Sequence, residues 1–363
     1  MQRLKIVQCL FTFEMGGAQV LALELLNEMC KEHDVFLIVI NNAYNKNLLK
    51  LLDKRVQLHF INRKEGTRNP IPIIKFNLLL YKINPDIIHC HEPNVAKIIK
   101  YRNAKTLYTI HDVGIATSYY HMFDMLVAIS NAVFNDVRSG SHLPVKIVHN
   151  GIPMDLFNIR TRYALVKGQP VKLVQLSRLM HEKKGQDILL RALSKVLNEY
   201  GFRDLTLDFI GSGHSYDYLV KLTKELGLEN HVNFIGEKDR DWLFSNLSQY
   251  HLLIQPSRYE GFGLTILEGF AAGLPVLASN IDGPAEVIKN LPAGFLFENE
   301  NIDGCSKKLM SIFKIYENDE MGELMNSTIP IIKQKYSMKT CVKDYLEEYY
   351  QLIGVTSREL NII

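Results

Sequence analysis

The chain has 363 residues, 47% of them hydrophobic and 22% charged, which indicates a soluble globular protein with more residues than one core comfortably serves. No apolar run reaches the roughly 18 residues needed to span a bilayer, the first residues read as a strand rather than a signal peptide, and the five cysteines are scattered without a zinc-binding spacing. We therefore expect a cytoplasmic two-domain protein with no metal and no cofactor, whose net charge of +3 divides into +7 over residues 1–162 and −4 over the remainder.

Seven apolar runs in the first half predict the buried strands of a parallel sheet. They cover residues 4–10, 35–40, 56–61, 86–90, 106–110, 125–129 and 145–148. Helical patterns lie between most of these runs, and the clearest covers residues 18–30. Repeated units of this kind predict an α/β, Rossmann-like domain with helices on both faces of its sheet.

Basic side chains gather in the first half without an obvious amphipathic helix. The cluster comprises Lys46, Lys50, Lys54, Arg55, Arg63, Lys64 and Arg68. Such a surface could contact anionic lipid head groups, placing the protein on the inner face of a membrane, or a phosphorylated acceptor. It could equally be a solvated surface with no partner, and both interpretations stay open. A nucleic-acid partner is not expected.

Two loops of the first half carry candidate binding groups. Gly16 and Gly17 stand at the start of the first helix, which suits an anion or the close approach of a sugar, although a glycine pair also suits a simple tight turn. His111 follows the run 106–110 at its carboxyl end, where open α/β sheets bind ligands. With a pKa near its usual value of about 6.5 it could donate a hydrogen bond to a substrate, and a capping or packed histidine is the alternative.

A turn signal at residues 149–153 and an irregular polar stretch after it predict a domain junction near residues 151–168. A second series of strands is expected at residues 173–175, 205–210, 232–235, 252–254, 276–278 and 294–297, each but the last followed by a helical pattern. The expected domains are residues 1–160, together with a C-terminal helix at about 340–363, and residues 165–338. The predicted fold is two Rossmann-like domains with parallel sheets that face a cleft.

Four consecutive strand-to-helix loops of the second half present groups that suit a nucleotide. Arg178 and Lys184 could converge on a diphosphate. Gly211 begins an incomplete dinucleotide fingerprint, and Ile235 lies where backbone groups could meet a base edge. The fourth loop follows the run 252–254, contains Glu260, and leads into a helix at about residues 264–272.

The stretch 257–275 combines phosphate donors with hydroxyl acceptors. Gly261 and Gly263 let backbone N–H groups approach a ligand, and the helix start adds a positive dipole end. Glu260 and Glu268 would repel a phosphate, yet both are good acceptors for hydroxyl groups. This combination predicts a ligand that is part phosphate and part sugar. The alternative is that the two carboxylates only complement a helix dipole or face solvent.

These residues also carry a family resemblance. Glu260-Gly-Phe-Gly-Leu-Thr-Ile-Leu-Glu268, with Ala271-Ala-Gly-Leu-Pro-Val276 after it, resembles the E-x7-E signature of retaining GT-B-fold glycosyltransferases, the group 1 glycosyltransferases of family four. Further landmarks follow in the same order as in the family, at residues 16–18, 109–112, 148–153, 177–179 with 184–185, and 210–213. Gln19 and His214 depart from the family pattern, which leaves donor and acceptor undefined.

The resemblance implies a role for each site residue. Arg178 and Lys184, with Lys183 as a substitute, would bind the donor diphosphate, and Glu268 would bind the ribose hydroxyls. Glu260 and the backbone of Gly261, Phe262, Gly263 and Leu264 would hold the donor sugar and the distal phosphate. His111 would contact that sugar from the other domain, Gly16 and Gly17 would line the cleft, and Gly211 and Ile235 would belong to the donor site. The C-terminal helix would cross back to the first domain.

The reaction implied by the resemblance is transfer of a sugar from a nucleotide-sugar, with UDP favoured, to a saccharide or lipid-linked acceptor, with retention at the anomeric carbon and without a metal. Capsule, lipopolysaccharide or other cell-surface polysaccharide or glycolipid synthesis would be its setting. The Asp239-Arg-Asp241 sequence is expected to cap a helix rather than bind a metal. The alternatives are a nucleotide-sugar epimerase of the same fold and a non-catalytic sugar-nucleotide-binding subunit.

Overall fold

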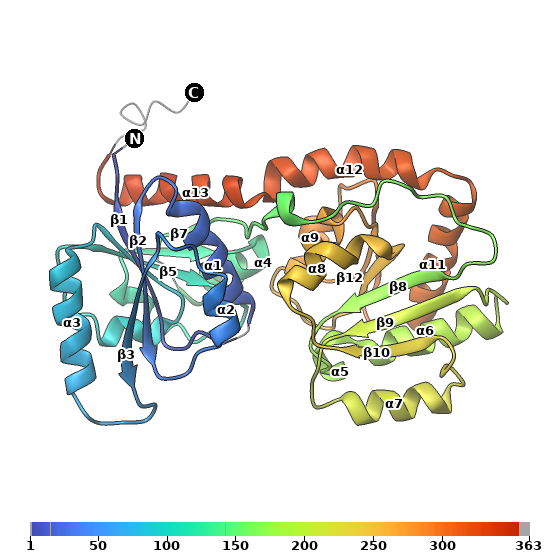
Figure 1. Cartoon of the computed structure of the whole chain (residues 1–363), viewed down its shortest axis with the longest axis horizontal. Coiled ribbons are helices and arrows are strands. Elements are labelled where there is room, and N and C mark those ends of the chain that lie inside the picture. Colours follow the sequence, from blue (N-terminus) through green and yellow to red (C-terminus); the bar gives the residue numbers. More distant parts are fainter. Residues whose placement is uncertain (1, 15, 142, 356–363) are drawn as a thin grey trace. The chain divides into compact units, whose positions relative to one another are not determined.

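The protein is described by a computed structural model that covers residues 2–14, 16–141 and 143–355. The chain divides into two compact units. The first contains the described residues up to Ile152 together with those from Tyr336 onward, and the second runs from Pro153 to Lys335 (Figure 1). No described helix is both long enough and apolar enough to cross a bilayer.

The first unit is a seven-stranded parallel sheet in the order β3-β2-β1-β4-β5-β6-β7. The strands are β1 (Lys5–Leu10), β2 (Asp34–Asn41), β3 (Gln57–Arg63), β4 (Ile87–Cys90), β5 (Lys105–Ile110), β6 (Met125–Ala128) and β7 (Val145–Ile147). Its helices are α1 (Gly17–Met29), α2 (Lys46–Lys50), α3 (Ile71–Ile83), α4 (Asn131–Gly140) and α13 (Met338–Leu352), with short 3-10 turns at Pro93–Lys97 and Tyr120–Met122. All seven predicted strands are confirmed, and most of the residues in these strands are buried, as the apolar runs required.

The second unit is a six-stranded parallel sheet in the order β10-β9-β8-β11-β12-β13. The strands are β8 (Val171–Leu176), β9 (Leu205–Ile210), β10 (Val232–Gly236), β11 (Leu252–Gln255), β12 (Val276–Asn280) and β13 (Gly294–Glu298). The helices are α5 (His181–Lys184), α6 (Gln186–Asn198), α7 (Tyr216–Glu225), α8 (Arg240–Asn246), α9 (Leu264–Ala271), α10 (Asp282–Ile288), α11 (Ile302–Glu317) and α12 (Met321–Tyr336). Short 3-10 turns lie at Met154–Leu156 and Leu247–Gln249.

Every strand predicted for the second unit is confirmed, with one error in the pattern that follows them. The last strand, β13, was expected to lack a helix after it, but α11 begins four residues beyond its end. The Asn301 side chain caps this helix by accepting a hydrogen bond from the Gly304 N–H (2.7 Å). The sequence before this cap is short and polar, so apolar periodicity alone does not reveal where the helix begins.

Both sheets reverse their strand order next to the first strand of the unit. In the first unit this switch point lies between β1 and β4, and in the second between β8 and β11. Ligands of open α/β sheets bind at the carboxyl ends of the strands that flank such a point. The loops after β1, β4, β8 and β11 are therefore where a site is expected in each unit.

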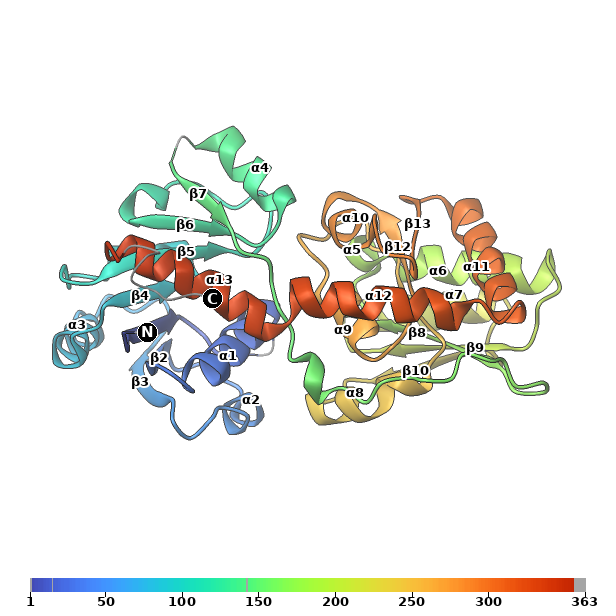
Figure 2. The same cartoon turned by 90° about the horizontal axis from the view of Figure 1, so that it is seen from above.

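The C-terminal helix α13 belongs to the core of the first unit, as the family resemblance implies. It packs beside α1, as Figure 2 shows, and contributes Tyr345 and Tyr349, both fully buried. The Tyr349 hydroxyl lies 2.6 Å from His89 Nδ1, and the Tyr345 hydroxyl lies 3.0 Å from Thr109 Oγ1. These polar contacts fix the helix against β4 and β5. Residues 356–363, included in the predicted C-terminal helix, lie outside the described residues.

Candidate donor site

The loops after β8 and β11 lie in direct backbone contact at the switch point of the second unit. A Cβ on Gly185, which has a left-handed φ of 64°, would lie only 1.9 Å from the carbonyl oxygen of Pro256. The Gln175 side chain, at the end of β8, donates to the Lys184 carbonyl (2.8 Å). A glycine at 185 is thus required both by its backbone conformation and by the closeness of the neighbouring loop.

Two of the predicted site residues pair across this contact. Lys184 Nζ lies 2.5 Å from Glu260 Oε2, and both side chains are more than four-fifths buried. Gln255 Nε2 also approaches the same carboxylate oxygen (3.3 Å) and donates to Ser257 Oγ (2.9 Å). A carboxylate held by an ammonium and an amide keeps a fixed orientation, and its other oxygen can accept from a ligand hydroxyl.

The glycine loop of residues 261–263 leads directly into the start of α9. Gly263 is the N-cap of α9 with a left-handed φ of 95°, so the first helical N–H groups follow directly on Gly261 and Phe262. Gly283 of α10 packs against this loop, since a Cβ there would lie 2.5 Å from the Glu260 carbonyl oxygen. At its other end, the helix stops at Gly273 (φ 76°), whose successor Leu274 donates its N–H to the Gly269 carbonyl (2.9 Å).

Arg258 holds the two loops together, and sequence reasoning missed it. Its guanidinium makes a two-pronged ion pair with Asp187 (2.9 Å on each prong), donates to the His181 carbonyl (2.6 Å) and reaches Glu300 (2.7 Å). Its backbone N–H donates to the Lys183 carbonyl (2.8 Å). The ion pairs raise the pKa of Arg258 above its ordinary value, chiefly through Asp187. No signal in the sequence distinguishes Arg258 from other basic residues.

Glu268 lies on α9 with a buried arginine as its partner. Arg240, the first residue of α8, places a terminal guanidinium nitrogen 3.6 Å from Glu268 Oε1, and both side chains are about nine-tenths buried. The same guanidinium stacks over the Phe244 ring (4.9 Å to the centroid). Arg240 stands between the two aspartates of the Asp239–Asp241 sequence, which is the signal that could have found it. As predicted, Asp239 caps α8, accepting from the Trp242 N–H (2.8 Å).

The other predicted donor-site residues occupy the same edge of the sheet. Arg178 follows β8, is exposed, and has no hydrogen bond or ion pair from its guanidinium to any part of the chain that the structure describes. Lys183 is half-buried. Gly211 follows β9 with φ 141°, and a Cβ there would lie 2.0 Å from the Ser177 carbonyl oxygen, so the β9 loop also lies against the β8 loop. Ile235 is half-buried near the end of β10.

In the first unit, the half-buried His111 ends a hydrogen-bonded chain that runs through the buried side chains of His91 and Gln8. His111 Nε2 lies 3.0 Å from His91 Nδ1, and His91 Nε2 lies 3.1 Å from Gln8 Oε1. Since an amide oxygen only accepts, His91 donates to Gln8 through Nε2, and His111 donates to His91 through its own Nε2. In this arrangement the remaining nitrogen of His111, Nδ1, is an acceptor.

The expected pKa and hydrogen-bonding role of His111 are corrected by this chain. Burial lowers the pKa of His111 to about 4, so the ring is neutral where a free histidine would titrate. The N–H of the neutral ring is engaged by His91, whereas a hydrogen bond from His111 to a substrate was expected. Burial also lowers the pKa of His91 well below its ordinary value.

The remaining first-unit candidates stand at the carboxyl end of β1. Gly16 is the N-cap of α1 with an extended backbone, and Gly17 is exposed in its first turn. Across the switch point, the Glu92 carboxylate, just after β4, accepts from the Phe11 N–H (3.2 Å). Burial raises the pKa of Glu92 to about 7. No pattern in the sequence singled out Glu92 as a site residue.

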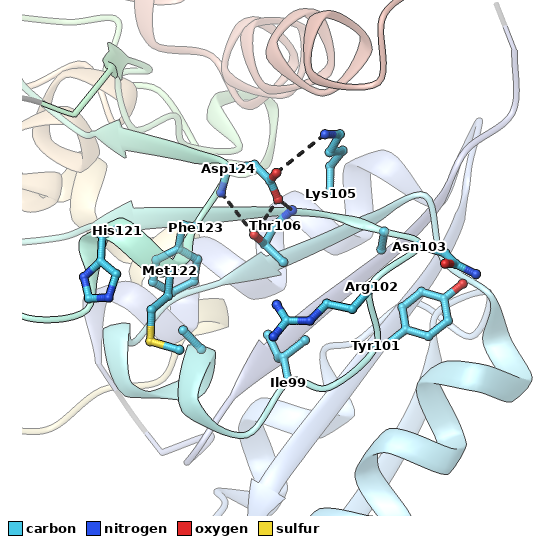
Figure 3. Close-up of a pocket in the computed structure, with 12 residues that line it drawn as sticks. Ile99, Tyr101, Arg102, Asn103, Lys105, Thr106, His121, Met122, Phe123 and Asp124 are labelled. Carbon is cyan, nitrogen blue, oxygen red and sulfur yellow. Dashed lines mark hydrogen bonds and ion pairs between the residues drawn. The ribbon is translucent and has the colours of Figure 1, made fainter.

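One cavity of the first unit lies away from these residues. It has a volume of about 520 Å³ and lies around the amino ends of β5 and β6 (Figure 3). It is lined by Ala96, Ile99 and residues 101–106 and 121–124. Asp124 accepts from the Thr106 N–H (2.8 Å) at its wall and lies 3.6 Å from Lys105. Within the described residues no group of three or more histidine, cysteine, aspartate or glutamate side chains is arranged to hold a metal ion.

Two family models match the chain. The model described as glycosyltransferase family 4 matches residues 15–156, and the model described as glycosyl transferases group 1 matches residues 159–325. An uncharacterized glycosyltransferase of Methanocaldococcus jannaschii is 26% identical over 73% of this chain and 75% of its own length. The N-acetyl-alpha-D-glucosaminyl L-malate synthase of Bacillus anthracis is 24% identical over 63% of this chain and 60% of its own length. For another uncharacterized Methanocaldococcus jannaschii glycosyltransferase, 27% identical, the match spans only 41% of either chain.

Solved structures share the fold along the chain. A glycosyltransferase from Rickettsia africae superposes with a TM-score of 0.82 at 24% identity, over 98% of this chain and 100% of its own. The Anabaena protein HepE, solved with UDP and glucose, superposes with a TM-score of 0.76 at 18% identity, over 95% of this chain and 99% of its own. With two parallel Rossmann-like sheets, the fold is GT-B. The two family models together span nearly the whole chain, which belongs to the group 1 glycosyltransferases.

Proposed function

We propose that this protein transfers a sugar from a UDP-sugar to a hydroxyl group of a saccharide or lipid-linked acceptor, with retention at the anomeric carbon. The observation that carries the proposal is the buried Lys184–Glu260 pair beside the start of α9 at the β8–β11 switch point. It joins a cation, a hydroxyl acceptor and a helix N-terminus in one place, which are the groups needed for a ligand that is part sugar and part phosphate.

The donor diphosphate is assigned to Arg178 and Lys184, with Lys183 as a substitute, and to the α9 N-terminus. Arg178 is exposed and its guanidinium has no partner among the described residues, so it can turn toward an anion without breaking an ion pair. The pairing of Lys184 with Glu260 sets the position of its ammonium group before the donor arrives. Gly211 and Ile235 are assigned to the base.

The hydroxyl groups of the donor are assigned to the two glutamates. Glu268 would accept from the ribose and Glu260 from the donor sugar, together with backbone groups of residues 261–264. For His111 the proposal is a hydrogen bond from a sugar hydroxyl to Nδ1, in keeping with its neutral ring. Gly16 and Gly17 would allow the sugar or the acceptor to approach the start of α1.

The proposed reaction takes place on one face of the sugar. The bond between the anomeric carbon and the diphosphate oxygen breaks, and the acceptor oxygen bonds to that carbon from the same side. The acceptor proton passes to the leaving phosphate oxygen, and the developing charge is stabilised by Arg178, Lys184 and the helix N-terminus. No metal is assigned a part, because Asp239 is already used as a helix cap.

The names of similar proteins support a role in cell-surface chemistry. The similar structures include a lipopolysaccharide outer core galactosyltransferase, with a TM-score of 0.73 at 18% identity, and HepE in complex with UDP-glucose. We therefore propose a polysaccharide or glycolipid as product, made in the cytoplasm or on the inner face of the membrane.

A donor screen followed by product analysis tests the proposal. Thermal unfolding with UDP-, GDP- and ADP-sugars should show the largest rise in melting temperature with a UDP-sugar, since a ligand that binds only the native state stabilises it. Proton NMR of the product should show the anomeric configuration of the donor, with and without a chelator. An inverted product, or a donor altered without any acceptor present, would overturn the assignment in favour of another chemistry.

A further inference from the structure

The outward face of α3 is apolar along its whole length. Four side chains on this helix are 54 to 63% exposed. They are Ile71, Ile74, Leu78 and Tyr81, hereafter the α3 stripe. Their spacing of three and four residues places them on one side of the helix, while Phe76 and Leu80 on the other side are fully buried. The helix thus has a second apolar face that the core of the first unit does not use.

Such a concentration of exposed apolar side chains is unusual for this chain. Among the described residues, seven large hydrophobic side chains are more than half exposed, and four of them form the α3 stripe. Single exposed hydrophobic residues need no explanation, but a contiguous set on one helix marks an interaction surface. The helix lies beside β3, the edge strand of the first sheet (Figure 1).

Basic residues lie on both sides of the α3 stripe. Lys75 and Lys82 lie on α3 next to the stripe, at the helical spacing of one turn from Ile71 and Leu78. On the opposite side, the Lys100 N–H donates to Asn77 Oδ1 of α3 (2.6 Å), and the Tyr101 ring meets Tyr81 edge-on at 5.1 Å.

The same bias in charge extends beyond the helix. Arg102 follows Tyr101 and is exposed at the wall of the cavity described above (Figure 3). Residues 63–85 contain five lysine or arginine residues and one acidic residue, Glu65. The stripe therefore lies beside a chain segment with a strong excess of basic residues, which includes Arg63, Lys64 and Arg68 of the basic cluster seen in the sequence.

A second copy of the chain is a poor match for this surface. The stripe has the spacing of a coiled-coil seam, but the flanking Lys75 and Lys82 would meet only uncharged or basic residues of an identical helix. One 13-residue helix face also offers far less than the roughly 1,200 Å² that stable protein interfaces bury. An anionic surface with an apolar interior satisfies both the lysines and the stripe.

We infer that α3 is the surface by which this protein binds an anionic lipid bilayer. The α3 stripe enters the boundary between head groups and acyl chains, and Arg68, Lys75, Lys82, Lys100 and Arg102 face the lipid phosphates. The inference goes beyond sugar transfer and does not depend on it, because it requires neither donor nor acceptor.

Vesicle co-sedimentation of the full chain tests the inference. Binding is measured to phosphatidylcholine vesicles with and without phosphatidylglycerol. The wild type should bind the anionic vesicles at least about tenfold more tightly, and binding should weaken as salt is raised. The double variants Ile74→Asn/Leu78→Asn and Lys75→Glu/Lys82→Glu should each lower the affinity about tenfold or more, the first through lost apolar burial and the second through lost charge.

Matched controls come from the second unit, where Val166 is 58% exposed and Lys167 is exposed. Val166→Asn and Lys167→Glu should leave vesicle binding unchanged. All variants alter exposed side chains, so their melting temperatures should match that of the wild type. This measurement shows that any loss of vesicle binding is not caused by loss of folding. Sugar transfer to a soluble acceptor should also survive in both α3 variants.

Three results would overturn the inference. The first is no binding of the wild type to anionic vesicles, and the second is equal binding by the wild type and the α3 variants. The third is a dimer, detected by light scattering, that Ile74→Asn/Leu78→Asn disperses while vesicles remain unbound, which would assign the stripe to a second copy of the chain.

Discussion

The burial of His111 predicts how the rate of transfer depends on pH. Its pKa is lowered to about 4 by burial, and His91 holds its Nε2–H. We expect the rate of transfer to show no ionisation near pH 6.5 from this residue, because the ring is neutral well below that pH. The check is kcat from about pH 4.5 to about pH 8 for the wild type and His111→Gln. A break near pH 6.5 that the variant lacks would show that His111 titrates normally.

The buried Arg240–Glu268 pair predicts that substitutions of the two residues have non-additive effects on the free energy of unfolding. Arg240→Met removes a buried cation that lies 3.6 Å from the Glu268 carboxylate, so it should lower the free energy of unfolding by about 3 kcal/mol. Glu268→Gln should cost less, and the double variant should be less destabilised than the sum of the two. Urea unfolding of all four proteins checks this. Additive effects would indicate that the 3.6 Å contact carries no coupling.

The same pair should influence the donor. If Glu268 binds the ribose, Glu268→Ala lowers the affinity for UDP measured by calorimetry, and Arg240→Met lowers it too by releasing the carboxylate from its position. Unchanged UDP affinity in Glu268→Ala would contradict the ribose assignment.

Arg178→Ala is expected to slow transfer more than it weakens binding, because its charge matters most as the leaving group develops.

At the scale of elements, strands were far more predictable than contacts between side chains. Each strand of a parallel sheet is buried on both faces, so a run such as Leu252–Gln255 is visible in the sequence as continuous apolar residues. The Gly263 helix start was visible for a similar local reason. The partners of Arg258 and Glu268 were not visible, because they lie 71 and 28 residues away and meet only through the strand order.

The α3 stripe escaped prediction for a different reason. A helix with apolar residues on both faces has a weak periodicity, so α3 was not recognised in the sequence as an amphipathic helix. Only the packing shows that Phe76 and Leu80 face the sheet while Leu78 faces solvent.

The contacts of Arg258 predict that the loops after β8 and β11 keep their relative position only while this side chain joins them. Arg258→Ala removes the ion pair to Asp187 at the start of α6 and the bond to the His181 carbonyl of α5. We expect a loss of about 2–3 kcal/mol in unfolding free energy and a weaker affinity for UDP, because the loops after β8 and β11 lose their fixed register. Arg258→Lys should not rescue, since an ammonium cannot make the two-pronged pair.

Urea unfolding and calorimetry on one set of variants separate these effects. Arg191→Ala is the matched control, because Arg191 lies on the same α6 helix with its side chain exposed. It should leave both stability and UDP affinity unchanged. Full UDP affinity in Arg258→Ala, despite lower stability, would show that the site does not depend on this contact.

At the scale of the whole molecule, buried histidines make the stability dependent on pH. Burial lowers the pKa of His89 to about 3, that of His111 to about 4 and that of His251 to about 4. Between about pH 6.5 and pH 4 the unfolded chain therefore binds more protons than the native protein, and the free energy of unfolding falls as the pH falls. Burial also raises the pKa values of Glu92, Asp344 and Glu348, which act in the opposite sense over part of this range. Among the described residues these three carboxyl groups stand against six histidines with lowered pKa values.

His89 gives the sharpest test of this whole-molecule effect, because it is fully buried between Thr109 and Tyr349. Moving from pH 7.5 to pH 5 should cost about 2 kcal/mol through this residue alone. His89→Gln is expected to be less stable at pH 7.5 but to lose less on acidification, whereas the same change at the exposed His121 serves as the control. Urea midpoints at the two pH values decide the matter. Two results would contradict this prediction: a wild type that becomes more stable on acidification, or a His89→Gln variant that loses as much stability as the wild type. Either would show that His89 does not account for the loss of unfolding free energy at low pH.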